Sequence, residues 1–441
     1  MTDSPDSPSP PVSSITGVPA SHLVDLATFV QASPSSFHAV AEAAHRLSVA
    51  GFEALDESQE WPATAGKYFA VRDGAIVAWT TPEGATATTP FRIIGAHTDS
   101  PGFALKPKPT TASHGWLQAG VEVYGGPLHN SWLDRELEFA GRLVFDDGLT
   151  ALVRTGPFLR FPQLAIHLDR GVNGDGLTLS AQQHLNPVIG VGTLADADVV
   201  SHLARLAGRA GRDVVGYDIV TADTAAPQVF GLDGTLFASG RLDNLSSVHA
   251  GLVALLAVAK GTGASSITVF AAFDHEEVGS QTRSGAGGPF LENVLARIGD
   301  ATGASVSDRA RAFAGSWCLS ADAGHAVHPN YPERHDPVNR PVVNRGPLLK
   351  INANKRYATD GPGAAEWARS CAQAGVEYQE FVSNNSVACG STIGPITATR
   401  LGIRTFDVGI ALLSMHSARE LCGVDDPAAL ATAMHAFLAP A

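Results

Sequence analysis

An unbroken apolar run that ends in a block of acidic residues constrains this chain more than any other feature. Residues 267–273 read Ile-Thr-Val-Phe-Ala-Ala-Phe and continue directly into Asp274-His275-Glu276-Glu277. A short apolar run of this kind, rich in β-branched and aromatic residues, predicts a buried strand. Ligands in open α/β sheets bind outside the carboxyl ends of the strands. We therefore expect this strand to deliver its carboxylates to a functional site at the sheet edge.

The adjacent Glu276 and Glu277 would repel each other in one pocket unless a cation or a shared proton separates their roles. The economical arrangement is that one glutamate binds a metal ion and the other moves protons. This interpretation predicts further histidine and aspartate ligands at the ends of other strands. The candidates are His97, Asp243, Asp322 and His416. Each of them follows an apolar strand or lies in the turn after one.

Each candidate taken alone has an ordinary structural explanation. A buried histidine is commonly just hydrogen-bonded, and Asp243 precedes a helical stripe, where aspartate commonly serves as an N-cap. Their shared position at the end of one predicted sheet favours a metal site instead. Asp99, two residues after His97, would then hold the imidazole of that histidine in the orientation that the metal requires.

Mixed histidine and carboxylate ligands suit zinc, cobalt or manganese better than calcium or magnesium, which prefer oxygen ligands. Together with one glutamate the set has five ligands, too many for a single catalytic zinc with an open position. Five ligands suit two metal ions that share a bridging carboxylate, an arrangement that favours hydrolysis of an amide. The remaining glutamate would carry a proton from the attacking water to the leaving amine.

The length and the distribution of turns predict two domains, because 441 residues exceed the roughly 250–300 at which one hydrophobic core stops growing. Residues 1–18 are rich in Ser and Pro and predict a disordered tail. Residues 107–232 carry short strands separated by turns, with one helix near 196–207, and predict an inserted β-rich domain. The predicted strands of this insertion are residues 121–124, 137–145, 150–154 and 177–179. Residues 19–106 and 233–441 would form the main α/β domain, with a mixed central sheet flanked by helices.

The net charge argues against two classes of partner, and the cysteines and the N-terminus indicate the cellular compartment. The net charge of −13 argues against nucleic acid, which requires a basic surface, and against anionic membranes. No apolar run approaches the roughly 20 residues that a membrane span needs, and the N-terminus lacks the pattern of a signal peptide. The four cysteines form no CxxC pair, which is typical of a reducing compartment. We therefore expect a cytoplasmic protein without a nucleic-acid or membrane partner.

Five motifs follow one another along the chain: His97–Gly102, Gly240–Asn244, Asp274–Ser280, Ser320–His325 and Ser414–Ser417. This set, in this order, resembles the motifs of the M18 metallo-aminopeptidases, the aspartyl aminopeptidase family. The resemblance runs from about residue 20 to the C-terminus and includes residues 125–135 in the predicted insertion. It implies a fold of the zinc-exopeptidase type.

The resemblance implies a role for each candidate ligand. His97 and Asp322 would bind one metal ion, Glu277 and His416 would bind the other, and Asp243 would bridge them. Glu276 would be the general base and Asp99 the partner of His97. A cis peptide bond would follow Asp243.

For the substrate, the resemblance indicates His325, Lys350 and Tyr357. Lys350 would be the cation that faces an acidic N-terminal side chain, although a structural ion pair is the alternative explanation, as a core hydroxyl is for Tyr357. His167 in the insertion would complete the active site of a neighbouring subunit, or else bind metal. The resemblance also implies homododecamers built from dimers that the inserted domain forms.

We therefore expect a di-metal aminopeptidase, with zinc as the preferred ion, that removes N-terminal Asp or Glu from short peptides. One alternative is a metallo-deacylase or carboxypeptidase that uses the same metal pair. The other is a structural homologue without catalytic activity.

Overall fold

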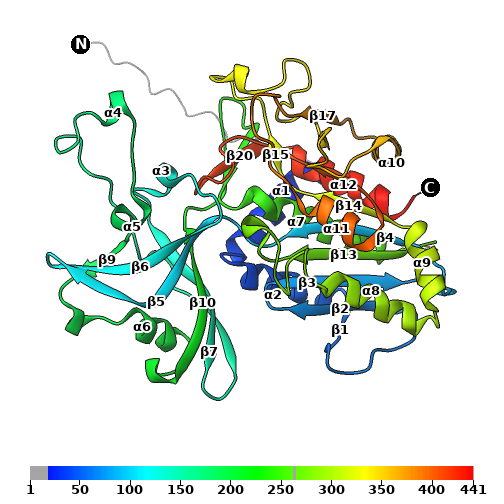
Figure 1. Cartoon of the computed structure of the whole chain (residues 1–441), viewed down its shortest axis with the longest axis horizontal. Coiled ribbons are helices and arrows are strands. Elements are labelled where there is room, and N and C mark those ends of the chain that lie inside the picture. Colours follow the sequence, from blue (N-terminus) through cyan, green and yellow to red (C-terminus); the bar gives the residue numbers. More distant parts are fainter. Residues whose placement is uncertain (1–17, 262–264, 441) are drawn as a thin grey trace, which may run out of the picture.

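The computed structural model describes residues 18–261 and 265–440, so the predicted tail lies outside the described residues except for its last residue. Figure 1 shows two lobes side by side, each built on its own sheet. The larger lobe holds a nine-stranded sheet and most of the helices, and the smaller lobe holds a six-stranded sheet.

The nine-stranded sheet is mixed, which confirms the predicted fold class. Its four central strands, β13, β4, β14 and β18, run parallel, so their carboxyl ends meet at one edge. The order across the sheet is β1-β2-β3-β13-β4-β14-β18-β16-β17. The strands are β1 (Glu53–Ala54), β2 (Gly66–Arg72), β3 (Ala75–Thr81), β4 (Phe91–His97), β13 (Ile267–Phe273), β14 (Trp317–Ala321), β16 (Leu348–Ile351), β17 (Gln379–Val382) and β18 (Arg404–Gly409).

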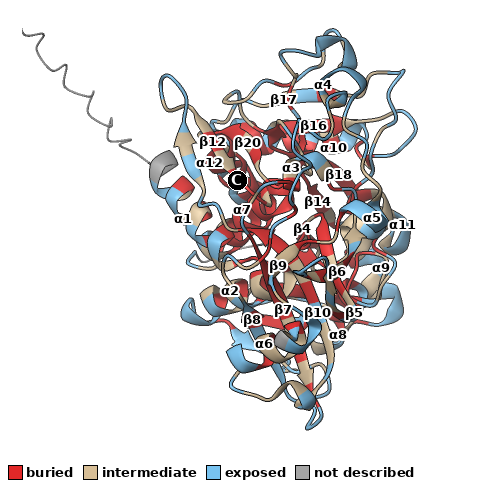
Figure 2. Ribbon diagram, turned by 90° about the vertical axis from the view of Figure 1, so that its left-hand side faces the viewer, coloured by how far each residue is buried: buried red, intermediate tan, exposed pale blue. Residues whose placement is uncertain are grey.

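Helices cover both faces of this sheet and form a separate hydrophobic core with each face. Every residue of β13 is buried, as its apolar sequence predicts, and Figure 2 shows buried residues concentrated in the strands between the helices. One face carries α1 (Val18–Ala32), α2 (Ser36–Val49), α7 (Leu242–Val258), α10 (Gly361–Ala374) and α12 (Asp426–Leu438). The other face carries α8 (Phe290–Ala301), α9 (Val306–Ala314) and α11 (Ile393–Leu401).

The six-stranded sheet has a core of its own around Phe103, Phe139 and Phe161. Residues 177–179, expected to be a strand, are irregular, because Leu177 and Leu179 pack against this core without pairing with a strand. The order is β8-β7-β10-β5-β6-β9. The elements are β5 (Gly102–Ser113), β6 (Trp116–Tyr124), β7 (Leu137–Phe145), β8 (Thr150–Arg154), β9 (Val188–Val191), β10 (Val214–Asp223) and the helices α3 (His129–Trp132), α4 (Val172–Asp175), α5 (Ala181–His184) and α6 (Val199–Leu206).

Two small sheets and a short helix lie near the junction of the lobes. The strand β5 begins five residues before the predicted domain boundary, and the exact division of the chain stays a prediction. The small sheets are β11 (Gln228–Phe230) with β12 (Leu236–Ser239) and β20 (Glu420–Gly423), and β15 (Gly324–His325) with β19 (Ala411–Leu412). The 3-10 helix η3 spans Glu276–Val278.

Candidate active site

The parallel strands bring the predicted ligands to one edge of the large sheet. His97 is the last residue of β4 and lies in register with the last residue of β13. Asp322 follows β14 directly, and Glu276 and Glu277 stand in η3, just beyond the end of β13. The predicted strands therefore place these four side chains where the sequence indicates.

Asp243 lies between the two histidines. Its Oδ1 is 3.4 Å from His97 Nε2, and its Oδ2 is 3.5 Å from His416 Nε2. The same nitrogen of His97 lies 3.5 Å from Asp322 Oδ1, while His416 Nε2 lies 3.4 Å from Glu277 Oε2. The five predicted ligands thus form two groups that share one aspartate.

The chemistry of this donor set fits divalent metal ions. Three groups of side chains each bring three ligand atoms within 4.8 Å of one another. Among the described residues, Asp243 Oδ1 and Glu277 Oε1 are buried without a hydrogen-bond partner. A buried carboxylate oxygen without a donor is costly, and a cation removes that cost. The three groups are His97 with Asp243 and Asp322, His97 with Glu276 and Glu277, and Asp243 with Glu277 and His416.

The crowding of carboxylates shifts the protonation of the whole cluster. Burial raises the pKa of Glu276 to about 7, and nearby aspartates add to this although His97 opposes it. Burial alone would lower the pKa of His416, but Asp243 and Glu277 raise it to about 10. Burial also lowers the pKa of His97, but its carboxylate neighbours outweigh this effect and raise that pKa well above 6.5. The protonated imidazoles thus supply positive charge that bound cations would replace.

Asp99 supports both sides of this cluster. Its Oδ1 lies 3.3 Å from His97 Nδ1 and accepts a hydrogen bond of 3.0 Å from the backbone N–H of Glu276. Its Oδ2 accepts hydrogen bonds from the backbone N–H of Glu277 at 3.1 Å and from the Tyr124 hydroxyl at 2.8 Å. The Asp99 backbone carbonyl also accepts a hydrogen bond of 3.1 Å from His97 Nδ1. Asp99 therefore orients a histidine through its carbonyl and its carboxylate, and its carboxylate fixes the backbone that carries the two glutamates.

Sequence reasoning missed Glu420, a buried residue at the start of β20. Its Oε2 accepts a hydrogen bond of 2.9 Å from the Asp243 N–H, and its Oε1 accepts one of 2.8 Å from the His416 N–H. The available signal was a charged residue directly before the apolar pair Leu421-Cys422, since a buried charge requires partners.

Asp243 does not act as the N-cap that its position suggested. Asp243 and Asn244 form a kink with non-helical backbone angles near the start of α7, and among the described residues Asp243 Oδ1 accepts no hydrogen bond from the helix. The peptide bond between Asp243 and Asn244 is cis, as the resemblance implies. Ser100 donates a hydrogen bond to the carbonyl of Asp243, and Asn244 donates one to the carbonyl of Ala321. These contacts tie the turn to two strand ends.

A cavity of about 520 Å³ opens onto the cluster, and the three predicted substrate residues of this lobe line it. His325 is exposed in β15, whereas Tyr357 is buried. Lys350 is 1% exposed, and its Nζ donates to the Ala323 carbonyl at 2.6 Å and lies 3.2 Å from Asp322 Oδ2. Its Nζ also lies 5.3 Å from the centre of the Tyr357 ring. Lys350 therefore forms a structural ion pair and borders the cavity at the same time.

His167 lies apart from this cavity. It occupies an exposed turn of the smaller lobe between β8 and β9, and it is absent from the cavity lining that the described residues form. Its neighbours Leu164, Ile166 and Leu168 are 56%, 46% and 75% exposed.

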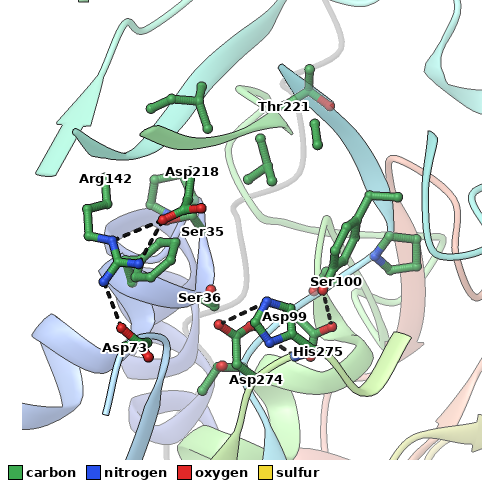
Figure 3. Close-up of a pocket in the computed structure, with 18 of the residues that line it drawn as sticks. Ser35, Ser36, Asp73, Asp99, Ser100, Arg142, Asp218, Thr221, Asp274 and His275 are labelled. Carbon is green, nitrogen blue, oxygen red and sulfur yellow. Dashed lines mark hydrogen bonds and ion pairs between the residues drawn. The ribbon is translucent and has the colours of Figure 1, made fainter. Parts of the chain in front are cut away.

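A second cavity of about 360 Å³ lies between the lobes, behind Asp99 (Figure 3). Asp274 and His275, the first half of the acidic block, line this cavity instead of the catalytic one. Arg142 in its wall pairs with Asp73 at 2.9 Å and with Asp218 at 2.7 Å. The acidic block thus faces two different spaces.

Comparison with known proteins decides the family. The family model described as "Aminopeptidase I zinc metalloprotease (M18)" matches residues 29–438. The chain belongs to the M18 family. It is 57% identical over 422 residues to "Probable M18 family aminopeptidase 2" of Streptomyces coelicolor, covering 95% of this chain and 98% of that protein. It is 45% identical over 422 residues to the protein of the same name in Mycobacterium tuberculosis, covering 94% and 97%.

Solved structures agree with this assignment. The structure "Cryo-EM structure of the Ape4 and Nbr1 complex" matches with a TM-score of 0.91 and 34% identity, covering 95% of this chain and 86% of that chain. The structure "Structure of S. cerevesiae mApe1 dodecamer" matches with a TM-score of 0.83 and 28% identity, covering 94% and 95%. This M18 protein is thus a metallo-aminopeptidase, a hydrolase of peptide bonds, and the comparisons do not favour the deacylase, carboxypeptidase or inactive alternatives. Among its described helices, none has the length and hydropathy needed to cross a bilayer.

Proposed function

We propose that this M18 aminopeptidase uses two divalent metal ions to remove N-terminal Asp or Glu from short peptides. The observation that carries the proposal is the pair of ligand groups that share Asp243, with Glu276 beside them. His97 and Asp322 would hold one ion, and Glu277 and His416 would hold the other. Zinc fits the mixed histidine and carboxylate set, as cobalt and manganese also would.

Bound metal ions would polarise the scissile carbonyl and acidify water. Glu276 would then act as the general base. Its Oε2 lies 4.0 Å from His97 Nε2, its side chain lines the cavity, and its backbone is fixed by Asp99. From this position it can accept the proton of an attacking water and give it to the leaving amine.

Lys350 and His325 support a preference for an acidic N-terminal residue. The Lys350 ammonium has three donors, and two of them meet the Ala323 carbonyl and Asp322. The third donor remains for a substrate carboxylate in the cavity. His325 is exposed on the same wall and can donate to a second carboxyl or acyl oxygen, and the Tyr357 ring limits the space beside Lys350.

A panel of peptides on protein reconstituted with zinc, cobalt or manganese tests this function. We expect turnover of peptides with a free N-terminal Asp or Glu, little turnover of their N-acetylated forms, and slower turnover of neutral peptides. Glu276→Gln should retain both metal ions but lose most of its turnover. Equal rates on acidic and neutral peptides would refute the preference, and an active Glu276→Gln variant would refute the assigned base.

We also propose that the smaller lobe forms dimers that assemble into a homododecamer in the cytoplasm. The exposed turn around His167, with its apolar neighbours, supports a contact in which this histidine reaches the active site of a neighbouring subunit. Light scattering of the full chain measures the mass. His167→Ala should lower kcat while the assembly persists, and a catalytically competent monomer would exclude this proposal.

A further inference from the structure

A short segment of the smaller lobe reaches both halves of the metal cluster within the same chain. We call residues 124–131, from the end of β6 into α3, the bridging segment. It begins at Tyr124, which contacts Asp99, and its next residues pass the loop that carries His416. Neither Tyr124 nor Gly126 is among the residues that line the catalytic cavity, so the bridging segment acts on the metal ligands from behind.

The first contact is a relay from Tyr124 to His97. The Tyr124 hydroxyl donates a hydrogen bond of 2.8 Å to Asp99 Oδ2. The other carboxylate oxygen of Asp99 lies 3.3 Å from His97 Nδ1, and the Asp99 backbone carbonyl accepts a hydrogen bond of 3.1 Å from the same nitrogen. Asp99 is 5% exposed, so few groups other than these can support its carboxylate. Hydrogen bonds of this kind fix the ring orientation of a metal-binding histidine and strengthen it as a ligand.

The second contact fixes His416 directly. Its Nδ1–H donates a hydrogen bond of 3.0 Å to the Gly126 carbonyl, which leaves Nε2 to face Asp243 and Glu277. The His416 carbonyl accepts a hydrogen bond of 2.9 Å from the Leu128 N–H. Two residues further along its loop, the Ala418 N–H donates a hydrogen bond of 3.0 Å to Ser131 Oγ.

The bridging segment lies very close to the ligands, and Gly125 allows this. Gly125 has φ of +67°, and a Cβ on it would lie 3.1 Å from Glu277 Cβ. A larger residue at this position would strain the backbone and push it away from Glu277. At Gly126 a Cβ would lie 3.5 Å from His416 Nδ1, an ordinary contact distance.

We propose that Tyr124 and Ser131 are positioning residues, and that the bridging segment sets the metal affinity of its own chain through His97 and His416. The smaller lobe would then be required for metal binding within each chain, independently of any role in assembly. This inference rests on the proposed di-metal function, since it assigns the residues that hold the ligands of that site.

Tyr124→Phe in the full-length protein tests the first contact, because it removes only the hydroxyl. Tyr217→Phe is the matched control: Tyr217 lies in the same sheet, and its hydroxyl donates a hydrogen bond of 2.7 Å to the Lys106 carbonyl. Isothermal titration of metal-free protein with zinc should show roughly 10- to 100-fold weaker binding for Tyr124→Phe and unchanged binding for Tyr217→Phe. KM should stay constant, and kcat should recover when zinc is in excess.

Ser131→Ala tests the second contact. The melting temperature shows whether Tyr124→Phe folds, and if it does not, Ser131→Ala alone tests the positioning role of the bridging segment. It too should bind zinc more weakly. In an Asp99→Asn background, Tyr124→Phe should add no further loss, because the hydroxyl acts through that carboxylate.

The outcomes separate this inference from the function on which it rests. If the unmodified protein neither binds zinc nor cleaves unblocked peptides, the proposed function fails. If it does both, but Tyr124→Phe and Ser131→Ala bind zinc as tightly as Tyr217→Phe, the positioning role alone is overturned.

Discussion

Replacing Lys350 by Met would separate substrate recognition from structural support. Methionine keeps the length of the side chain but removes the ammonium, which is buried against the Ala323 carbonyl and Asp322. Because Asp322 is a proposed metal ligand, the variant should impair every substrate. It should impair acidic substrates more, since they also lose the third donor of the ammonium.

The two losses can be given magnitudes. A hydrogen bond to a charged group contributes about 1.5–3 kcal/mol, which corresponds to a factor of roughly 10 to 150 in a rate. The loss of support for Asp322 should therefore lower kcat/KM on neutral peptides by roughly that factor. Loss of the contact with the substrate carboxylate should lower the ratio of acidic to neutral kcat/KM by a similar factor again.

The assay compares kcat/KM for matched peptides with N-terminal Glu and Gln at saturating metal. Lys355→Met is the control, because Lys355 is exposed and its Nζ donates to the Thr359 carbonyl, at 3.1 Å, instead of to a proposed metal ligand. A Lys350→Met variant that loses activity equally on both peptides would refute the selectivity role and leave Lys350 as a support for Asp322.

Three further predictions concern groups outside the substrate cavity. Glu420→Gln should weaken zinc binding roughly 10- to 100-fold in a titration, because one of the N–H groups of Asp243 and His416 then faces an amide donor; unchanged affinity would contradict this. Asp407→Asn should lower the free energy of unfolding by about 1–3 kcal/mol, measured by urea unfolding. The two oxygens of this buried carboxylate accept three hydrogen bonds, and an amide has only one acceptor oxygen. An unaltered urea midpoint would contradict this prediction. Burial lowers the pKa of His38 from 6.5 to about 4, so the unfolded chain binds a proton between these pH values that the folded chain does not. Stability should therefore fall as the pH drops through this window, and His38→Gln should flatten that part of the melting-temperature profile.

The central sheet and the ligand positions were predictable because they depend on local pattern. Runs such as 91–96 and 267–273 are apolar without interruption, and such runs form buried strands. Parallel strands end at one edge, so the residues that follow them converge without any knowledge of distant contacts. This is why His97 and Asp322 could be placed from the sequence.

The contacts behind the ligands could not be predicted, because they join segments far apart in the chain. Nothing local to Glu420 indicates that it accepts the N–H of Asp243, and Tyr124 reads as an ordinary strand residue. The ion pair of Lys350 with Asp322 likewise depends on the approach of separate strands. For residues 177–179 the sequence predicted a strand that the structure does not contain. Their apolar side chains pack against a core, but their backbone joins no sheet.

The central claim is that five side chains hold two cations through one shared aspartate. Zinc titration of metal-free protein, with turnover of an N-terminal Glu peptide followed in the same samples, tests it most directly. We predict two equivalents bound per chain and turnover that reaches its maximum at the second equivalent, with both lost in Asp243→Ala. A single equivalent at full activity, or full turnover in the chelated protein, would contradict the account.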